Sequence, residues 1–331
     1  MAKMISIQQY DQSYCEKWDK FVLEKSANGT FLQTRRFLSY HPEKRFEDNS
    51  LIFFCGTDIV AVLPAHINKD EESVLSSHKG STFGGLVIGK QFCKINYLDM
   101  IFEAFEEYIR RNGIDEVILK QTGRIYQNKE TEILDYYLFM NGYTCAKEMG
   151  YFIDFSQYED DIISNFTSSR RRDYRYSLKN RFRFAELIED KEIREFYRVL
   201  CDNYKKFGKQ PIHTIEELID FKFSRLAEHT RFYGVYHEDE MIASAMIFTF
   251  DKKVFHTQYL AVCQNQTNMF ANEFLYTNLI HEAKGNGFEM ISFGTSTFDE
   301  GRILNRPLAQ YKEGFGTSEY VNHIYKKHFS R

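Results

Sequence analysis

One succession of elements occurs twice in this sequence of 331 residues, and it constrains the fold more than any other feature. Each half shows the pattern of a β-hairpin, an apolar helix, an Asn-Gly stop and a short buried strand. The first copy comprises 51–55, 59–66, 92–111 and 115–120, and the second comprises 231–236, 241–250, 254–262, 269–284 and 288–294. The Asn-Gly stops at 112–113 and 286–287 lie about 174 residues apart. We interpret the repetition as an internal duplication, with chance recurrence of a common α/β succession as the alternative.

Further helices and strands complete the two halves. The remaining segments expected in the first half are helices over 12–25, 31–40 and 129–140, and a strand pair or one long strand over 143–155. A helical insert follows, over 165–184, 190–205 and 215–228, with Thr167, Ser168 or Ser169 as the first N-cap. We therefore predict an N-terminal domain over 1–155 and a C-terminal domain over 156–331.

Composition restricts the class of protein. Apolar residues make up 43% of the chain, which is enough for a sizeable core. The formal net charge of −4 argues against nucleic-acid binding by the chain as a whole. The six cysteines form no C-x-x-C pair, and the sequence lacks a secretory signal and a transmembrane stretch. These features predict a soluble cytoplasmic protein with reduced thiols.

Familiar catalytic motifs do not occur. The sequence contains no P-loop, no G-x-G-x-x-G, no H-E-x-x-H and no G-x-S-x-G. We therefore expect no metal site, no nucleoside triphosphate site and no dinucleotide site.

The segment "SSRRRDYRYSLKNRFRF" (168–184) is the strongest local deviation in charge. Arg171, Arg175 and Lys179 follow one another at i, i+4 and i+8, so on a continuous helix they share one face. Like charges on one face repel unless an anion neutralises them, and arginine suits bidentate phosphate contacts. The run predicts a phosphate or carboxylate site, or a solvated helix face whose charges pair with acids from elsewhere.

Two glycine-containing segments are candidate ligand loops. "HKGSTFGG" (78–85) offers Ser81, Thr82 and Gly84 to a ligand, and its alternative is a plain connecting loop. "FGTSTFDEG" (293–301) places Thr295 and Ser296 at the carboxyl end of a buried strand, where ligands of α/β proteins tend to bind. Its alternative is a turn.

The strand "VFHTQYLAV" (254–262) is unusually polar for a central strand. Alternation places His256 and Gln258 on one face, and Thr257 and Tyr259 on the other. This polarity predicts a cleft beside the strand, with Tyr259 as a contact for substrate. His256 is either a catalytic group or a structural strand histidine.

Several of these segments together resemble the GNAT-fold acyltransferases of the Fem type. "FLQTRRF" resembles the F-x-Q-[ST] motif of that superfamily, and "SSRRRDYRYSLK" resembles its Arg-rich helix. "NEFLYTNLIHEAKGNGFEMISFG" resembles its helix, glycine turn and strand, and "YKEGFG" resembles its closing box. The superfamily includes aminoacyl-tRNA-dependent peptidyltransferases and relatives that use acyl-CoA. The resemblance covers most of the chain.

The resemblance implies an α/β (α+β) fold of two tandem GNAT-like domains, each a mixed, mostly antiparallel twisted sheet flanked by helices. It also implies transfer of an acyl group to an amine without a metal. By position, Lys312 would act on the acyl carbonyl, and Arg171 and Arg175 would bind the acceptor's anion, with Gln33 and Arg36 contributing. A lysine beside a developing oxyanion stabilises the tetrahedral intermediate. The alternative for Lys312 is a surface lysine in a tight turn.

The amine must lose a proton during the transfer, which calls for a general base. His256, Glu313 and water are the candidates. Within "RILNRPLAQYKEGFG" (302–316), we expect Arg302 at the edge of the cleft and Tyr311 beside the substrate.

Two departures from the family pattern concern the acyl donor. The segment "CQNQTNMFANEFL" (263–275) has no glycine, although ordinary GNAT enzymes hold the coenzyme A pyrophosphate with a glycine-rich loop here. We expect Asn268, Ala271 and Asn272 to hold the cofactor through the helix N-terminus instead. No charged heptads of the kind found in tRNA-using members with a coiled-coil arm are sustained.

The sequence thus predicts an N-acyltransferase that uses acyl-CoA, with acetyl-CoA as the expected donor. The expected acceptor is a small anionic amine such as a nucleotide- or lipid-linked amino sugar of bacterial cell-surface polysaccharide synthesis. The first alternative is an aminoacyl-tRNA-dependent ligase that acts on a peptidoglycan precursor. The second is a non-catalytic GNAT-like binding module.

Overall fold

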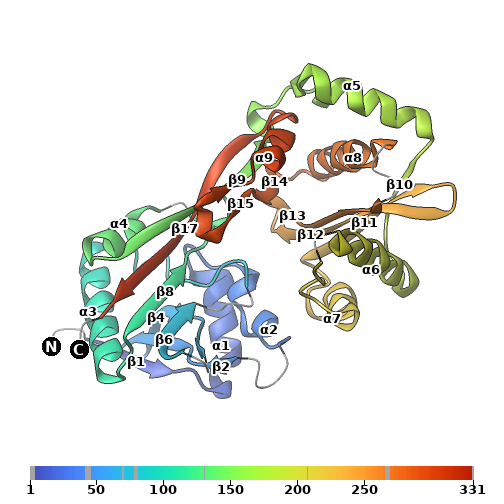
Figure 1. Ribbon diagram of the computed structural model, residues 1–331. Helices are drawn as coiled ribbons and strands as arrows, with labels where there is room; N and C mark the ends of the chain where they lie inside the picture. The colour runs from blue at the N-terminus through green and yellow to red at the C-terminus, as the bar shows by residue number, and fades with distance from the viewer. Residues whose placement is uncertain are drawn as a thin grey trace. The chain divides into compact units, whose positions relative to one another are not determined.

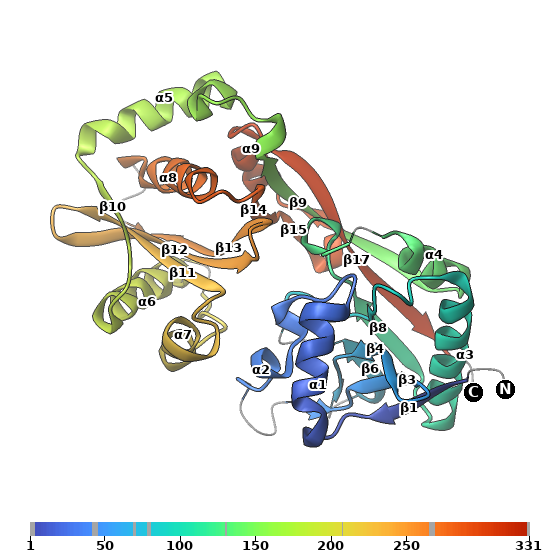
Figure 2. The same ribbon diagram turned by 180° about the vertical axis from the view of Figure 1, so that it is seen from behind.

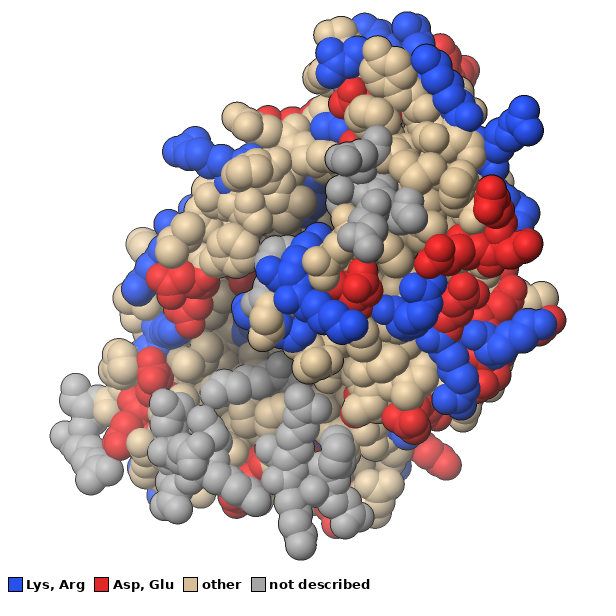
Figure 3. Space-filling model, turned by 45° about the vertical axis from the view of Figure 1, so that its right-hand side comes forward, with Lys and Arg blue, Asp and Glu red and all other residues tan. Residues whose placement is uncertain are grey.

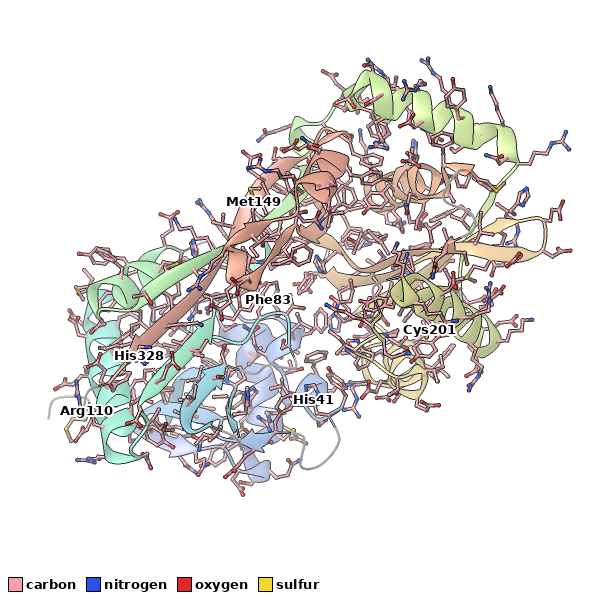
Figure 4. The ribbon with its side chains drawn as sticks, viewed as in Figure 1. His41, Phe83, Arg110, Met149, Cys201 and His328 are labelled. Atoms are coloured by element: carbon pink, nitrogen blue, oxygen red, sulfur yellow. The ribbon has the colours of Figure 1, made fainter. Side chains whose placement is uncertain are left out.

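The structure is a computed structural model that describes residues 4–41, 46–68, 71–77, 81–129, 131–206, 208–264 and 269–329. It divides into two compact units (Figure 1). Unit 1 consists of Met1–Glu148, Thr297–Ile303 and Val321–Arg331, and unit 2 consists of Met149–Ser296 and Leu304–Tyr320. Met149, labelled in Figure 4, is therefore the first residue of unit 2. The domain boundary expected between residues 155 and 156 stays a prediction.

Unit 1 contains a four-stranded antiparallel sheet in the order β1-β3-β4-β7 and a second set of strands in the order β17-β8-β6-β5-β2. The strands are β1 (Ile5–Gln9), β2 (Glu47–Asp48), β3 (Leu51–Cys55), β4 (Asp58–Leu63), β5 (Ala65–Asn68), β6 (Glu71–Ser77), β7 (Val87–Ile88) and β8 (Glu116–Lys120). Strands β9 (Thr144–Asp154) and β17 (Ser318–His328) contribute residues to both units. The helices are α1 (Cys15–Lys20), α2 (Arg35–Leu38), α3 (Ile95–Arg111) and α4 (Ile133–Met140).

The first copy of the repeat folds as its sequence pattern predicts. Strands β3 and β4 form an antiparallel hairpin whose turn contains Gly56 at φ +65°. Helix α3 buries its apolar stripe, including Leu98, Phe102 and Phe105, against these strands. It ends at Asn112, and Gly113 follows in the left-handed region, as an Asn-Gly stop requires.

Unit 2 contains strands in the order β10-β11-β12-β13-β14-β9. They are β10 (Arg183–Glu186), β11 (Thr230–His237), β12 (Glu240–Phe250), β13 (Val254–Val262) and β14 (Met290–Thr295), and the short strands β15 (Thr297–Phe298) and β16 (Ile303–Leu304) follow in the chain. The helices are α5 (Ser168–Ser177), α6 (Asp190–Lys205), α7 (Ile215–Asp220), α8 (Ala271–Gly285) and α9 (Arg306–Glu313). Helix α8 lies on one face of this sheet with α5 outside it, and α6 and α7 lie on the other face (Figures 1 and 2).

The second copy of the repeat is confirmed as well. Strands β11, β12 and β13 form the predicted antiparallel meander. Helix α8 lies between this meander and α5, and it buries Leu275, Leu279 and Ile280 in the core of unit 2. The segment 143–155 forms the single strand β9, and the helix expected over 215–228 ends earlier, with a π-helical turn at Phe221–Arg225.

Together these elements confirm the mixed, mostly antiparallel sheets with flanking helices expected from the sequence. Among the helices of the described residues, none is both long enough and apolar enough to cross a bilayer.

Candidate active site

The centre of unit 2 contains a point where two neighbouring parallel strands separate. Strands β13 and β14 pair in parallel only from Val254 to His256 on β13, opposite Met290 to Ser292 on β14. The parallel pairing stops after these three residues. We call the region just beyond His256 and Ser292, where the pairing has ended, the notch of unit 2.

Irregularities on the outer sides of both strands account for the notch. Gln258 is an extra residue of β13 against β12, because Met246 pairs with Tyr259 and Ile247 with Thr257. Strand β14 has an extra residue against β9 between Ser292 and Thr295. A bulge bends its strand and increases its twist, so two bulges at one level turn β13 and β14 away from each other.

Lys312 of α9 extends into the carboxyl end of β14. Its Nζ donates hydrogen bonds to the carbonyl oxygens of Gly294 at 3.0 Å and Thr295 at 2.9 Å. The residue is only 3% exposed, and no carboxylate of the described residues is close enough to shift its pKa. Burial lowers the pKa of Lys312 to about 7. An ammonium group has three N–H donors, so one remains beyond the two carbonyls.

The closing box "YKEGFG" holds this lysine in place. Phe315 is fully buried and stacks on Tyr276 with ring centroids 5.0 Å apart. Gly316 has φ +73°, and a Cβ there would lie 2.6 Å from the carbonyl oxygen of Asn165, so the box requires a glycine at this position. At its other end, α9 begins at an Asn305 cap with Pro307 in its first turn. The short helix is therefore fixed at both ends.

A buried polar network lies beside the lysine. Nδ1 of His256 is 3.2 Å from Oγ of Ser292, which is in turn 3.2 Å from the hydroxyl of Tyr320. Burial, together with the nearby positive charge of Lys312, lowers the pKa of His256 to about 3. The imidazole is therefore neutral at physiological pH and is a weak proton acceptor.

The lowered pKa of His256 predicts an acid-labile contribution to stability. The unfolded chain binds this proton near pH 6.5 and the folded chain only near pH 3, so the free energy of unfolding falls as the pH decreases through that window. The fall is at most about 1.4 kcal/mol per pH unit. Urea unfolding across this range should show a smaller fall for His256→Asn, whereas His328→Asn, an exposed control, should follow the native protein. Equal pH dependence in all three would contradict the prediction.

The remaining sequence candidates of unit 2 lie at different depths. Thr295 accepts the lysine's hydrogen bond through its backbone, and Ser296 is 1% exposed. Glu313 is exposed and accepts a hydrogen bond from the hydroxyl of Tyr151 at 3.1 Å. Tyr259 is buried, and its hydroxyl lies 2.6 Å from Nδ1 of His213, which follows α6. Their roles as substrate contacts stay predictions.

The Arg-rich segment forms α5, capped by Thr167 as expected. The α-helix ends at Ser177, however, and Lys179 lies in the following 3-10 turn. The expectation that Arg171, Arg175 and Lys179 share one face of a continuous α-helix is therefore wrong for Lys179. Arg171 donates to the carbonyl oxygen of Ser164, and Arg175 is exposed. Arg302 is also exposed, on the 3-10 turn before β16, and belongs to unit 1.

Arg170 has a different environment from its neighbours in the run. It pairs with Glu273 of α8 at 2.5 Å, and both side chains are about nine-tenths buried. Its guanidinium also lies over the ring of Tyr311, 4.1 Å from the centroid. Arg170 therefore connects α5 to α8 through Glu273 and to α9 through the ring of Tyr311.

The expected cofactor contacts lie at the start of α8. Asn268 falls outside the described residues. Ala271 is fully buried and Asn272 is half-buried at the first two positions of the helix. Phe270 precedes them at φ +59° as the N-cap residue and makes no side-chain cap hydrogen bond. Backbone N–H groups at such a helix start suit a phosphate. Among the described residues, no group of His, Cys, Asp or Glu could hold a metal ion.

Comparison with solved structures identifies the fold. FemX matches over 98% of this chain and 97% of its own, at 11% identity and a TM-score of 0.68. The L-PGS structure from Bacillus licheniformis covers 98% of this chain and 94% of its own, at 13% identity and a TM-score of 0.63. A tandem GNAT protein from the clavulanic acid biosynthesis pathway covers 99% of both chains, at 8% identity and a TM-score of 0.58.

The chain has the Fem-like tandem GNAT fold. No family model matches the sequence, and no curated protein matches it significantly. The Fem-like fold is therefore established by structure, at sequence identities too low for function to follow from it.

The tandem fold places a second parallel ladder in unit 1. There β6 and β8 pair from Val74 to Ser76, opposite Glu116 to Ile118, again over three residues. Beyond this ladder the backbone N–H of Gly84 donates to the carbonyl oxygen of Lys120 at 3.0 Å. In unit 1, the backbone of a glycine-containing loop thus bonds to the end of β8, as Lys312 bonds to the end of β14 in unit 2.

Gln33 secures that loop. It is fully buried, and its Nε2 donates to the carbonyl oxygen of Gly84 and to Oγ1 of Thr122, both at 2.7 Å. Phe83, labelled in Figure 4, packs on Tyr126 with ring centroids 4.8 Å apart. Ser81 donates to the carbonyl oxygen of Leu32. The substrate contacts expected from Gln33, Ser81, Thr82 and Gly84 stay predictions. The hydrogen bonds described above for Gln33, Ser81 and Gly84 all join them to other residues of this protein.

Sequence reasoning did not find three residues beside Lys312. They are Ser292, Gly294 and Tyr320. Ser292 interrupts an otherwise apolar strand, which was a usable signal. Gly294 at φ +66° lies in the candidate ligand loop 293–301, and nothing in the sequence links Tyr320 to His256. Arg36 of the first motif is exposed, and its backbone N–H donates to Oδ2 of Asp19 at 3.1 Å.

Proposed function

We propose that this protein transfers an acyl group from acyl-CoA, with acetyl-CoA as the first candidate, to an amine at the notch of unit 2. One observation carries the proposal. A buried lysine donates to two backbone carbonyls at the point where β13 and β14 separate, and it retains one further donor. The solved tandem GNAT protein of similar fold is described with reference to AcCoA, which supports this donor.

In the proposed reaction the acceptor nitrogen forms a bond to the acyl carbonyl carbon, and the bond to the coenzyme A sulfur then breaks. The third N–H of Lys312 donates to the carbonyl oxygen as negative charge develops on it. The attacking nitrogen loses a proton from the tetrahedral intermediate to Glu313 or water, and the departing thiolate takes up a proton from solvent. His256 is a poor base at a pKa of about 3, and we assign it the positioning of Ser292.

For the acceptor we propose an amine that carries a phosphate, such as a nucleotide- or lipid-linked amino sugar. Arg171 and Arg175 of unit 2 are the proposed phosphate contacts, and the roles expected of Arg36 and Arg302 stay predictions. The start of α8, at Ala271 and Asn272, is the proposed contact for the coenzyme A phosphates. Assembly of cell-surface polysaccharide in a bacterial cytoplasm is the proposed setting.

The similarity to FemX supports one alternative, in which the donor is an aminoacyl-tRNA and the acceptor a peptidoglycan precursor. The protein should be incubated with labelled acetyl-CoA or with charged tRNA, each with a panel of amino sugars and peptidoglycan precursors. We expect thiol release and labelled amide only with acetyl-CoA. Transfer from charged tRNA alone would establish the alternative, and no transfer from either donor would favour the non-catalytic binding module.

A further inference from the structure

Helix α5 has two chemically different faces. The inward face, at i, i+3, i+4 and i+7, consists of Arg170, Asp173, Tyr174 and Ser177, all buried or half-buried. Arg170 pairs with Glu273 of α8, and this contact orients the helix. The opposite face is therefore directed away from α8, as the outer position of α5 in Figures 1 and 2 shows.

The outward face and the turn after it carry charge of one sign. We call this surface the α5 face; its exposed cations are Arg172 and Arg175 of the helix, and Lys179 and Arg181 of the turn after it. The only acid between residues 168 and 183 is Asp173, which is largely buried and is already contacted by Arg170 and Arg172. Figure 3 shows Lys and Arg side chains gathered over α5, at the top of the view. The whole chain has a net charge of −4, so this excess is local.

Two exposed apolar side chains lie among these cations. Tyr176 is 43% exposed and Leu178 is 52% exposed. An exposed leucine costs free energy in water, and here it is surrounded by cations. A helix that combines Lys and Arg with exposed aromatic and aliphatic side chains is typical of binding at a lipid-water interface.

We propose that the α5 face binds the surface of a bilayer that contains anionic lipids. This inference deepens the proposed function and rests on it, because it favours a lipid-linked acceptor. A cluster of four to eight cations suffices for such binding, and each cation near the surface contributes about 1 kcal/mol to the binding free energy. Nucleic acid is less suited to this face, because the ring of Tyr176 already contacts Phe270 at 5.5 Å and has Nζ of Lys179 4.8 Å from its centroid. Base stacking would need that ring.

The test measures co-sedimentation of the full chain with vesicles of phosphatidylglycerol and phosphatidylcholine, and with phosphatidylcholine alone. We expect binding only to the anionic vesicles, and weaker binding as salt increases. The triple variant Arg172→Gln/Lys179→Gln/Arg181→Gln should bind about a hundredfold more weakly. A Leu178→Ser variant should also bind more weakly, and this separates an interfacial contact from a purely ionic one.

A matched control changes the same charge elsewhere. The variant Lys90→Gln/Lys94→Gln/Lys129→Gln removes three exposed cations of unit 1 and should bind vesicles like the native protein. All variants should unfold at the native temperature, because the substituted side chains are exposed. Absence of vesicle binding, or an equal loss in the control, would overturn the proposal, and so would tight RNA binding that only the α5 variant loses.

Acyl transfer to a water-soluble amino sugar, followed as thiol release, keeps the two proposals distinguishable. The α5 triple variant should retain this activity. Native vesicle binding without any thiol release would leave the bilayer contact in place and reject the proposed chemistry. Thiol release without vesicle binding would support the proposed chemistry and reject the bilayer contact.

Discussion

Replacement of Lys312 by methionine is expected to lower kcat for acyl transfer about 10²–10³-fold, the usual effect of removing one donor to a developing oxyanion. Methionine retains the volume and apolar body of lysine but not the donor. The measurement is thiol release at saturating acetyl-CoA. Lys326→Met is the matched control, since Lys326 pairs with Glu300 in unit 1 and should be dispensable for the rate.

The pH dependence separates two roles of this lysine. As a donor, Lys312 must be charged, and its pKa is about 7. The ratio of native to Lys312→Met rates should therefore be highest below pH 7 and should fall as the pH rises. A ratio that increases through pH 7 would identify the neutral amine as a base and would contradict the proposed role.

A stability measurement on the Lys312→Met variant tests whether unfolding causes the expected loss of rate. The unfolded chain holds the lysine proton up to about pH 10.5 and the folded chain only to about pH 7, so Lys312 makes native stability rise with pH between these values. The methionine variant lacks this slope. It should be at least as stable as the native protein at pH 7, because it carries no buried amine that resists protonation.

Replacement of Arg170 by methionine is expected to lower the free energy of unfolding by about 3–5 kcal/mol, since it leaves Glu273 without its cation in a buried position. Urea unfolding of the native and variant proteins gives the difference. Removal of both charges, in Arg170→Met/Glu273→Met, should recover most of the loss, because an uncharged pair leaves no uncompensated carboxylate.

Arg172→Met is the control within the same helix. Arg172 is 63% exposed, and among the described residues its one ion pair is with Asp173, so its loss should change stability by less than about 1 kcal/mol. A small effect of Arg170→Met, or a double variant no more stable than the single one, would show that the pair contributes little beyond packing.

The repeated succession predicted most of the fold because its signals are local. The hairpin turn at Gly56, the apolar stripe of α3 and the Asn-Gly stops act within a few residues, and the structure has each of them. The bulges at Gln258 and beyond Ser292 could not be predicted, since a bulge depends on the register with a neighbouring strand. The notch therefore appears only in the structure.

The candidate site shows the same division. The closing box drew attention to Lys312, but its burial depends on Gly294 and Thr295, which lie about 17 residues earlier in the chain. The sequence presents the Arg-rich segment as one group, although Arg170 forms a buried ion pair and Arg172 and Arg175 face solvent. Arg170 differs from its neighbours because it pairs with Glu273, about 100 residues away. The pattern of charges along the sequence does not reveal that pairing.

The closing stretch of the chain is shared between the two units, and this has a consequence for biosynthesis. Residues 304–320 belong to unit 2, whereas residues 297–303 and 321–329 belong to unit 1, where β17 pairs with β8. Domains usually fold in order as they leave the ribosome. Here unit 1 cannot pair β8 with β17, and unit 2 lacks α9 with Lys312, until residues 304–328 have been translated. A nascent chain stalled before residue 304 therefore has no finished unit.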